Sequence, residues 1–143
     1  MMKNNGGYLI NQIQKISSRK FNELLKEKNI DEFNGSQGVI LYSLWKNKEL
    51  TIKEIGKITG LAKTSLTSML DRMEEKGLIR RKDNSEDKRS IKIMLTDKAK
   101  ELEKDYNDIS NKMSNIFYKN FSDKEINEIE NYLERIISNL EEQ

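Results

Sequence analysis

Residues 51–79 read TIKEIGKITGLAKTSLTSMLDRMEEKGLI, and this stretch decides the fold. Thr51 and Glu54 fit a capping box, in which each side chain accepts a hydrogen bond from the other residue's backbone amide. The short helix that follows ends at Gly60, a residue type that suits the left-handed position after a helix. A further helix begins at about Lys63 and ends at the next glycine. Apolar residues at helical spacing give both helices a buried face: Ile52, Ile55, Ile58, Leu66, Leu70 and Met73. Two helices joined by a tight glycine-containing turn form the helix-turn-helix pattern.

A short β-hairpin is predicted directly after these two helices. Residues 78–82 and 90–95 flank a polar turn, DNSEDK, at residues 83–88. In the second segment apolar residues alternate with Lys92 and Met94, which predicts a strand with one buried face. The residues expected on that face are Ile91, Ile93 and Leu95. Such a hairpin is typical of the wing of a winged helix.

Long amphipathic helices are predicted on both sides of this region. Residues 8–29 form the first, and another begins at the expected N-cap Ser36. Beyond the hairpin, residues 97–141 carry apolar side chains at steps of three and four, with a second capping box that begins at Ser122. We therefore expect a mainly α fold with a small β-hairpin wing (α+β), in a single domain of residues 1–143.

Composition narrows the function classes. The chain has 143 residues with 26 basic and 24 acidic side chains, but no His, Cys or Pro. It therefore has no thiol nucleophile, no imidazole base and none of the ligands that zinc prefers. Pairs of acidic residues near the end, such as Glu128 and Glu130, are expected on solvated helix faces rather than in an acid–base site. We expect no enzyme activity, no metal and no cofactor.

Charge is distributed unevenly along the chain. Residues 1–30 carry a net charge of +4 and residues 61–92 of +3, whereas residues 101–143 carry −6. A basic centre with an acidic tail fits contact with a polyanion on one face, and it fits a well-solvated mixed surface equally. The N-terminus has no apolar leader segment, and the longest apolar run is far shorter than the ~20 residues that span a bilayer. These features predict a cytoplasmic location.

Several short motifs between Ser36 and Ala99 occur together in one order and spacing. They are Ser36-Gln37-Gly38, Thr51–Ile55, Thr59-Gly60-Leu61, Leu70–Arg81, and Asp87–Ser90 followed by Leu95-Thr96. Together they resemble the MarR (multiple antibiotic resistance regulator) family of winged helix-turn-helix transcription regulators. The resemblance implies that residues 36–95 are a DNA-binding region and that residues 8–29 and 97–141 are dimerisation helices. Three positions depart from the family pattern: Ala62 replaces a capping Ser, Ala99 replaces a frequent Gly, and Ser68 replaces a basic residue.

The resemblance makes helix 63–76 the recognition helix. Its first turns offer short donors and acceptors that suit base edges in the major groove: Lys63, Thr64, Ser65, Thr67 and Ser68. In an arbitrary protein such residues would only cap the helix and face solvent. In a helix-turn-helix followed by a wing, we expect them to contact DNA. Arg72 is either a phosphate clamp or the partner of Glu74 or Glu75. Lys53 is either a phosphate contact or a solvated lysine.

The wing supplies a second set of predicted contacts. In relatives an Asp-x-Arg motif places its Arg in the minor groove, while the Asp steadies that Arg. In this sequence these residues are Asp87 and Arg89, and Lys88 is a further phosphate candidate. An Arg suits this place because narrow A·T-rich minor grooves concentrate negative potential. The alternative is a surface ion pair that stabilises the hairpin.

The terminal helices have two interpretations, an intramolecular core or the two-fold dimer interface that the family implies. The residues assigned to the dimer are Ile13, Ile16, Ile109, Met113, Ile129, Leu133 and Ile136. Tyr8, Tyr42 and Trp45 are likewise either core residues or the lining of a pocket for a small aromatic or anionic effector.

These observations predict a homodimeric transcriptional regulator that binds a pseudo-palindromic operator in double-stranded DNA. The resemblance further implies that it represses transcription and responds to a small-molecule effector. The alternative is a winged-helix protein-interaction module without DNA binding. Binding to duplex DNA that weakens steeply with salt distinguishes the two.

Overall fold

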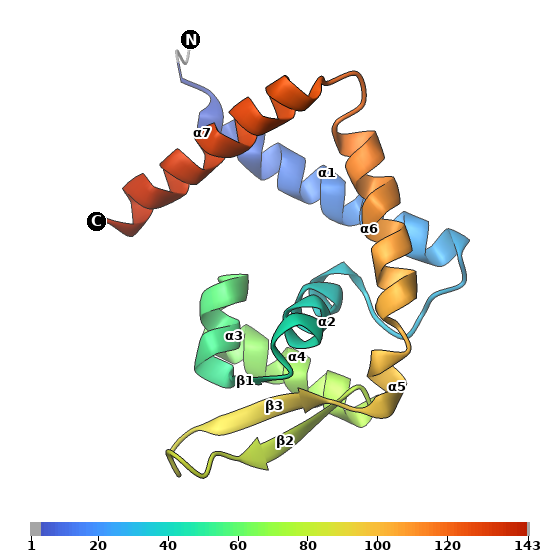
Figure 1. The fold of residues 1–143 in the computed structure, drawn as a ribbon, viewed down its shortest axis with the longest axis vertical. Coiled ribbons are helices and arrows are strands. Elements are labelled where there is room, and N and C mark those ends of the chain that lie inside the picture. Colours follow the sequence, from blue (N-terminus) through green and yellow to red (C-terminus); the bar gives the residue numbers. More distant parts are fainter. Residues whose placement is uncertain (1–3, 143) are drawn as a thin grey trace. The chain divides into compact units, whose positions relative to one another are not determined.

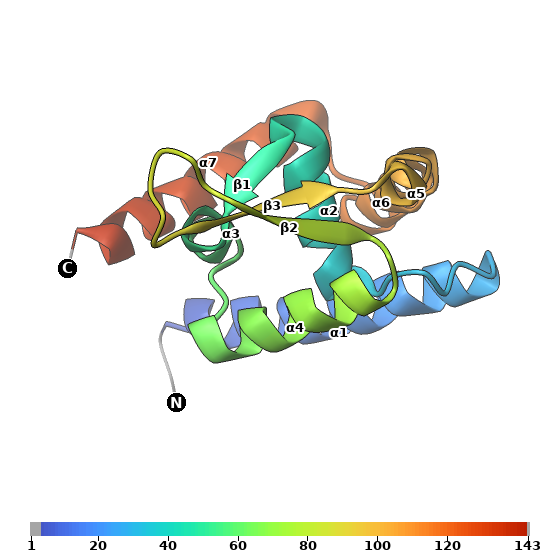
Figure 2. The same ribbon diagram turned by 90° about the horizontal axis from the view of Figure 1, so that it is seen from below.

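A computed structural model describes residues 4–142 of the chain. It shows helices and one small antiparallel sheet (Figures 1 and 2). In chain order the elements are α1 (Gly6–Glu27), α2 (Gly35–Asn47), β1 (Glu49–Thr51), α3 (Ile52–Thr59), α4 (Lys63–Glu75), β2 (Ile79–Asp83), β3 (Ile91–Leu95), α5 (Asp97–Lys100), α6 (Glu103–Phe117) and α7 (Asp123–Glu141). The predicted mainly α fold with a small β-hairpin is confirmed. Among the described residues no helix is long and apolar enough to cross a membrane.

Two compact units divide the chain, and the boundary falls inside α6 after Ser110. The first unit holds α1 to α5, the sheet and the start of α6. The second unit holds the rest of α6 and α7, whose start has the predicted capping box of Ser122 and Glu125. Within this second unit the Tyr118 hydroxyl donates a 2.8 Å hydrogen bond to the Glu130 carboxylate, which ties the end of α6 to α7.

The helices α3 and α4 form the predicted helix-turn-helix, but Ile58, which was predicted on the buried face of α3, is 52% exposed. Thr51 Oγ1 accepts from the Glu54 amide at 3.1 Å, and Glu54 Oε1 accepts from the Thr51 amide at 2.9 Å, so the capping box is confirmed. Gly60 ends α3 with φ of 71°, and Gly77 follows α4 with φ of 77°. Side chains disfavour this left-handed conformation, which explains why both helices stop at a glycine.

The sheet has the strand order β1-β3-β2 with antiparallel pairing. The predicted hairpin corresponds to β2 and β3, whereas β1 was not predicted because three residues are too few to show alternation. Ile93 and Leu95 are buried as expected, but Ile91 is 39% exposed. The prediction for Ile91 is wrong because this residue lies beside the turn that links β2 to β3, residues 84–90, which we call the wing turn. There Ile91 lines a surface groove instead of packing in the core.

Two helix boundaries also differ from the predictions. Asn34 rather than Ser36 is the N-cap of α2, since its side chain accepts from the Gln37 amide at 2.9 Å and Gln37 Oε1 accepts from the Asn34 amide at 3.1 Å. Asn caps a helix as well as Ser does, and only Asn34 has a Gln three residues on to complete a capping box. The apolar stripe after the hairpin is interrupted, because α5 ends at Lys100 and α6 begins at Glu103.

An aromatic cluster packs in the first unit. Tyr106 on α6 lies 5.4–6.1 Å, between ring centroids, from four other aromatic residues: Phe21, Phe33, Tyr42 and Trp45. Burial raises the pKa of the Tyr106 hydroxyl. Trp45 Nε1 also donates a 3.1 Å hydrogen bond to the Ala99 carbonyl. The cluster therefore joins α1, α2 and the start of α6 around one ring.

Replacing Gly38 with alanine is expected to destabilise the protein. A Cβ atom at Gly38 would lie 2.7 Å from Cε1 of Tyr106, so the ring or α2 must shift. Overpacking a buried site costs about 1–3 kcal/mol, more than the ~1 kcal/mol that alanine gains over glycine in a helix. Urea unfolding measures the difference. Gly56→Ala is the matched control, because its Cβ would lie 3.6 Å from Leu66, an ordinary contact. If Gly38→Ala proved as stable as that control, the Tyr106 ring would not be held in place.

Candidate nucleic-acid interface

A groove lies between the starts of α3 and α4 and the turn that links β2 to β3. It encloses about 470 Å³ and is lined by Ile52, Lys53, Leu61, Lys63, Leu66, Thr67, Arg89, Ser90 and Ile91. Four residues predicted to contact DNA therefore share this one groove: Lys53, Lys63, Thr67 and Arg89. Three of the four are cations, and a cationic groove attracts the phosphates of a nucleic acid.

The first turns of α4 present the polar residues predicted to read bases. All five are exposed, whereas Leu66 between them is buried in the core: Lys63, Thr64, Ser65, Thr67 and Ser68. Thr67 Oγ1 donates to the Lys63 carbonyl at 2.8 Å, so its hydroxyl proton is engaged and its oxygen keeps the capacity to accept a hydrogen bond. Thr64, Ser65 and Ser68 lie outside the groove lining, on the exposed surface of the same helix.

Replacing Ala62 with serine is expected to stabilise the protein by about 1 kcal/mol. Ala62 is the N-cap of α4, with an extended backbone at φ −63° and ψ 148°, and its methyl group accepts no hydrogen bond. A serine oxygen at this place can accept from the amide of Ser65. Thermal or urea unfolding measures the gain, with Ala62→Val as the control that adds bulk but no acceptor. Equal stability of the two variants would contradict this explanation.

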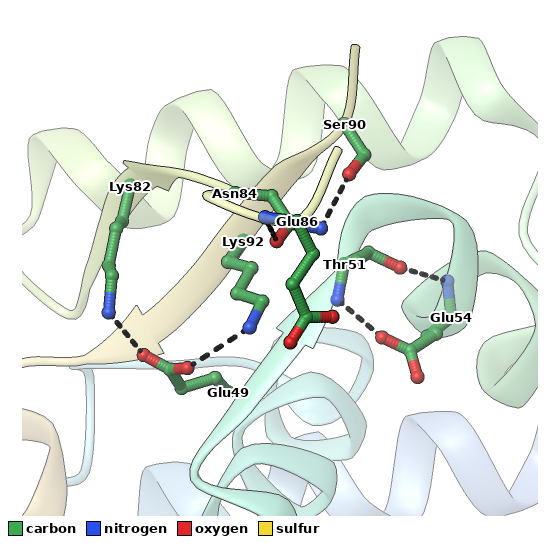
Figure 3. Close-up of polar contacts among 8 residues, drawn as sticks. All are labelled: Glu49, Thr51, Glu54, Lys82, Asn84, Glu86, Ser90 and Lys92. Carbon is green, nitrogen blue, oxygen red and sulfur yellow. Dashed lines mark hydrogen bonds and ion pairs between the residues drawn. The ribbon is translucent and has the colours of Figure 1, made fainter. Parts of the chain in front are cut away.

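The wing turn is organised by Asn84, a residue that the sequence analysis missed. Asn84 is only 7% exposed. Its Nδ2 donates to Ser90 Oγ at 2.8 Å and its Oδ1 accepts from the Glu86 amide at 3.1 Å (Figure 3). The signal in the sequence was an Asn at the start of a polar turn, since Asn side chains bond their own backbone two residues on.

Arg89 projects from this turn into solvent. Its side chain is 94% exposed, and its Nε lies 3.5 Å from Oδ1 of Asp87. The same Asp87 oxygen accepts from the Arg89 amide at 3.0 Å, so Asp87 fixes the backbone that carries the arginine. Lys88 between them is exposed as well. The wing turn thus carries two exposed cations, of which Arg89 lines the groove.

Arg72 is exposed on α4, and within residues 4–142 it forms no ion pair with Glu74 or Glu75. Glu74 instead binds Arg81 on β2, as does Asp71. The intrahelical pair weighed from the sequence is therefore not observed. The phosphate contact predicted for Arg72 therefore stays a prediction, and its side chain is exposed to solvent.

Charges also meet on the other face of the sheet (Figure 3). Lys82 and Lys92 lie directly opposite each other on β2 and β3, an arrangement that destabilises a sheet when uncompensated. The Glu49 carboxylate on β1 accepts from Lys82 Nζ at 2.9 Å and lies 3.5 Å from Lys92 Nζ. The hydrogen bond from Lys82 holds the pKa of Glu49 below its ordinary value. Glu49 thus joins the wing to the strand that leads into α3.

The residues predicted to form a dimer differ in exposure. Ile13, Ile16 and Ile136 are 45%, 54% and 41% exposed. Met113, Ile129 and Leu133 are half-buried. Ile109 is fully buried within the single chain, so it is a core residue rather than part of an exposed surface. The six other positions leave apolar surface uncovered in the single chain.

The three aromatic residues considered for an effector pocket do not come together. Tyr42 and Trp45 belong to the Tyr106 cluster. Tyr8 lies on α1 thirteen residues before Phe21, the member of that cluster on the same helix, which corresponds to about 20 Å along the helix axis.

Comparisons with known proteins find transcriptional regulators among the curated relatives and MarR proteins among the solved structures. Residues 33–91 match the model of the MarR family. The organic hydroperoxide resistance transcriptional regulator of Bacillus subtilis is 37% identical over 90 residues, which are 63% of this chain and 59% of that protein. The transcriptional regulator SarZ of Staphylococcus aureus is 29% identical over 120 residues, 84% of this chain and 78% of SarZ. A crystal structure of a mutant MarR from E. coli complexed with operator DNA is 25% identical with a TM-score of 0.82, covering 95% of this chain and 99% of that one.

Proposed function

We propose that this chain, whose residues 33–91 match the model of the MarR family, is a transcriptional regulator that binds double-stranded DNA in a sequence-specific manner. The observation that carries the proposal is the groove beside α4. Its cations Lys53, Lys63 and Arg89 come from three different elements and surround one opening. The likeness to a MarR that was crystallised with operator DNA supports the same conclusion.

In the proposed complex α4 enters the major groove and the wing reaches the adjacent minor groove. The short polar side chains of α4, among them Thr64 and Ser68, approach base edges. Arg89 enters the minor groove, where a narrow A·T-rich segment concentrates negative potential. Lys53, Lys63, Arg72 and Lys88 contact phosphates, which supplies affinity without sequence information.

We further propose that the protein acts as a homodimer on a pseudo-palindromic operator. The exposed apolar residues of α1 and of the second unit support this, because a monomer rarely leaves such faces open to water. They include Tyr8, Leu9, Ile10, Ile13, Ile16, Ile136, Ile137 and Leu140. Two copies of α4 would then reach successive turns of one face of the duplex.

Repression and control by an effector complete the proposal. A dimer seated across a promoter occludes the polymerase, and a small aromatic or anionic ligand that changes the dimer geometry would release it. The Tyr106 cluster, with Tyr42 exposed at its edge, is the aromatic surface available to such a ligand. We also propose a cytoplasmic location, because a regulator of transcription acts where it can reach its DNA.

Selection of bound fragments from the source genome by the purified protein tests this function. We expect a palindromic sequence to be enriched and binding to weaken steeply with salt, because each neutralised phosphate releases counterions. An absence of duplex binding at low salt would favour the protein-interaction module instead.

Replacing Ser68 with alanine is expected to change the selected operator at one or two positions. A lost base contact costs about 1–3 kcal/mol at the affected base pair. The repeated selection measures the change. Glu75→Ala, at the other end of α4, is the control and should leave the preference intact. An unaltered preference in the Ser68 variant would mean that this face of α4 does not read bases.

A further inference from the structure

Arg81 joins the wing to the recognition helix through two charge-assisted hydrogen bonds. Its Nη2 donates to Oδ1 of Asp71 at 2.7 Å, and its Nη1 donates to Oε1 of Glu74 at 2.5 Å. Asp71 and Glu74 are neighbours three positions apart on the surface of α4. The planar guanidinium spans both carboxylates, which a point charge such as a lysine ammonium cannot do as well.

The register of the sheet explains why Arg81 reaches α4. Arg81 lies opposite Ile93, which is fully buried, so both side chains leave the sheet on its inner face. Arg80 lies opposite Met94 and therefore points to the outer face. The strand β2 is at the edge of the sheet, with β3 as its neighbour. The Arg81 bridge thus ties this edge strand directly to the helix.

We propose that Arg81 is a positioning residue for DNA binding, which fixes the wing relative to α4 so that both reach their grooves together. The inference rests on the proposed function. A DNA site that is contacted by a helix and a hairpin requires both at fixed positions relative to each other. A contact that fixes these positions before binding lowers the entropic cost of association. Two donors of Arg81 are already engaged by carboxylates, so its role differs from that of Arg89.

If Arg81 has this role, neutralising Asp71 and Glu74 should change operator affinity in the direction opposite to that expected from charge alone. Asp71 and Glu74 are anions on the helix that approaches DNA, and neutralising them should favour binding of a polyanion. If the two carboxylates hold Arg81 and through it the wing, the same change weakens operator binding. Affinity for unrelated duplex, which requires no register between helix and wing, should not fall.

The first experiment needs no DNA. Because the chain has no Cys, Ser65→Cys and Ser85→Cys place two spin labels, one on α4 and one on the wing turn. Labelled protein is diluted with unlabelled protein, and the distance distribution between the labels is measured. We expect Arg81→Gln to broaden or shift the distribution and Arg81→Lys to do so less. The matched control Arg80→Gln, which removes the same charge from the outer face, should leave it unchanged.

The second experiment measures affinity for the selected operator and for unrelated duplex over a range of salt. Arg81→Gln and the paired change Asp71→Asn with Glu74→Gln should each lower operator affinity on the order of tenfold. Combining all three substitutions should lower it little further. The salt slope should stay the same, because no phosphate contact is lost.

Three results would overturn the proposal. A narrow, unshifted label distribution in Arg81→Gln would show that Arg81 does not position the wing, whether or not the wild-type protein binds DNA. A salt slope that flattens by about two units per dimer would make Arg81 a phosphate contact. Higher operator affinity after neutralising Asp71 and Glu74 would show that only their charge matters. Failure of the wild-type protein to bind any duplex would instead reject the proposed function.

Discussion

A glutamate in place of Ile13 or Ile136 is expected to convert the protein to a folded monomer that no longer binds its operator tightly. Both side chains are more than 40% exposed in the single chain, so a charge there costs the isolated protomer little. In the proposed interface the charge would be buried without a partner, which costs about 3–5 kcal/mol. Because each 1.4 kcal/mol is a tenfold change, the dimer dissociation constant should rise by at least about two to four orders of magnitude. A monomer would then contact a single half-site of the operator.

Sedimentation velocity and operator titration measure these two effects. Asn11→Glu on α1 and Asn131→Glu on α7 are the controls, because they add the same charge at exposed polar positions of the same helices. We expect both controls to remain dimers with unchanged affinity. A monomeric Ile13→Glu protein that binds operator as tightly as the wild type would contradict the proposed dimer.

Features specified by residues close in sequence could be predicted. The capping box of Thr51 and Glu54 and the stop at Gly60 each depend on side chains within four positions, and the structure has both. The predicted start of α2 was wrong, although it also depends on residues close in sequence, because Asn34 and Ser36 are both good caps. The position of Gln37, three residues after Asn34, decides between them.

Contacts between different helices and strands could not be predicted from the spacing of residues along the sequence. The partners of Arg81 lie seven and ten residues away, and the inward direction of its side chain depends on the register of β2 with β3. The groove likewise depends on how the wing turn lies against the starts of α3 and α4. Ile109 illustrates a different limit. A helix needs an apolar stripe for a core and for a dimer interface alike, so periodicity did not reveal that this residue is buried within one chain.

Alanine at Arg89 is expected to leave the fold intact and to weaken operator binding about 5- to 150-fold, as the loss of ~1–3 kcal/mol of specific contact implies. The side chain is 94% exposed and its ion pair with Asp87 lies on the surface, where such pairs contribute about 0–1 kcal/mol to stability. Preference for A·T pairs at the outer flanks of the operator should fade, because groove width is sensed there. The bases read by α4 should be selected as before.

Two further wing variants separate the charge of Arg89 from its shape. If Arg89 neutralises a phosphate charge in each protomer, Arg89→Ala should flatten the log–log salt slope by roughly two units per dimer. Arg89→Lys keeps the charge and should keep the slope, but it lacks the planar fork and should lose the flank preference. Asp87→Ala removes the oxygen that accepts from the Arg89 amide at 3.0 Å, so it should act in the same direction as Arg89→Ala and more weakly. If Arg89→Ala bound with unchanged affinity, flank preference and salt slope, the wing would not contact DNA, and the interaction-module alternative would gain support.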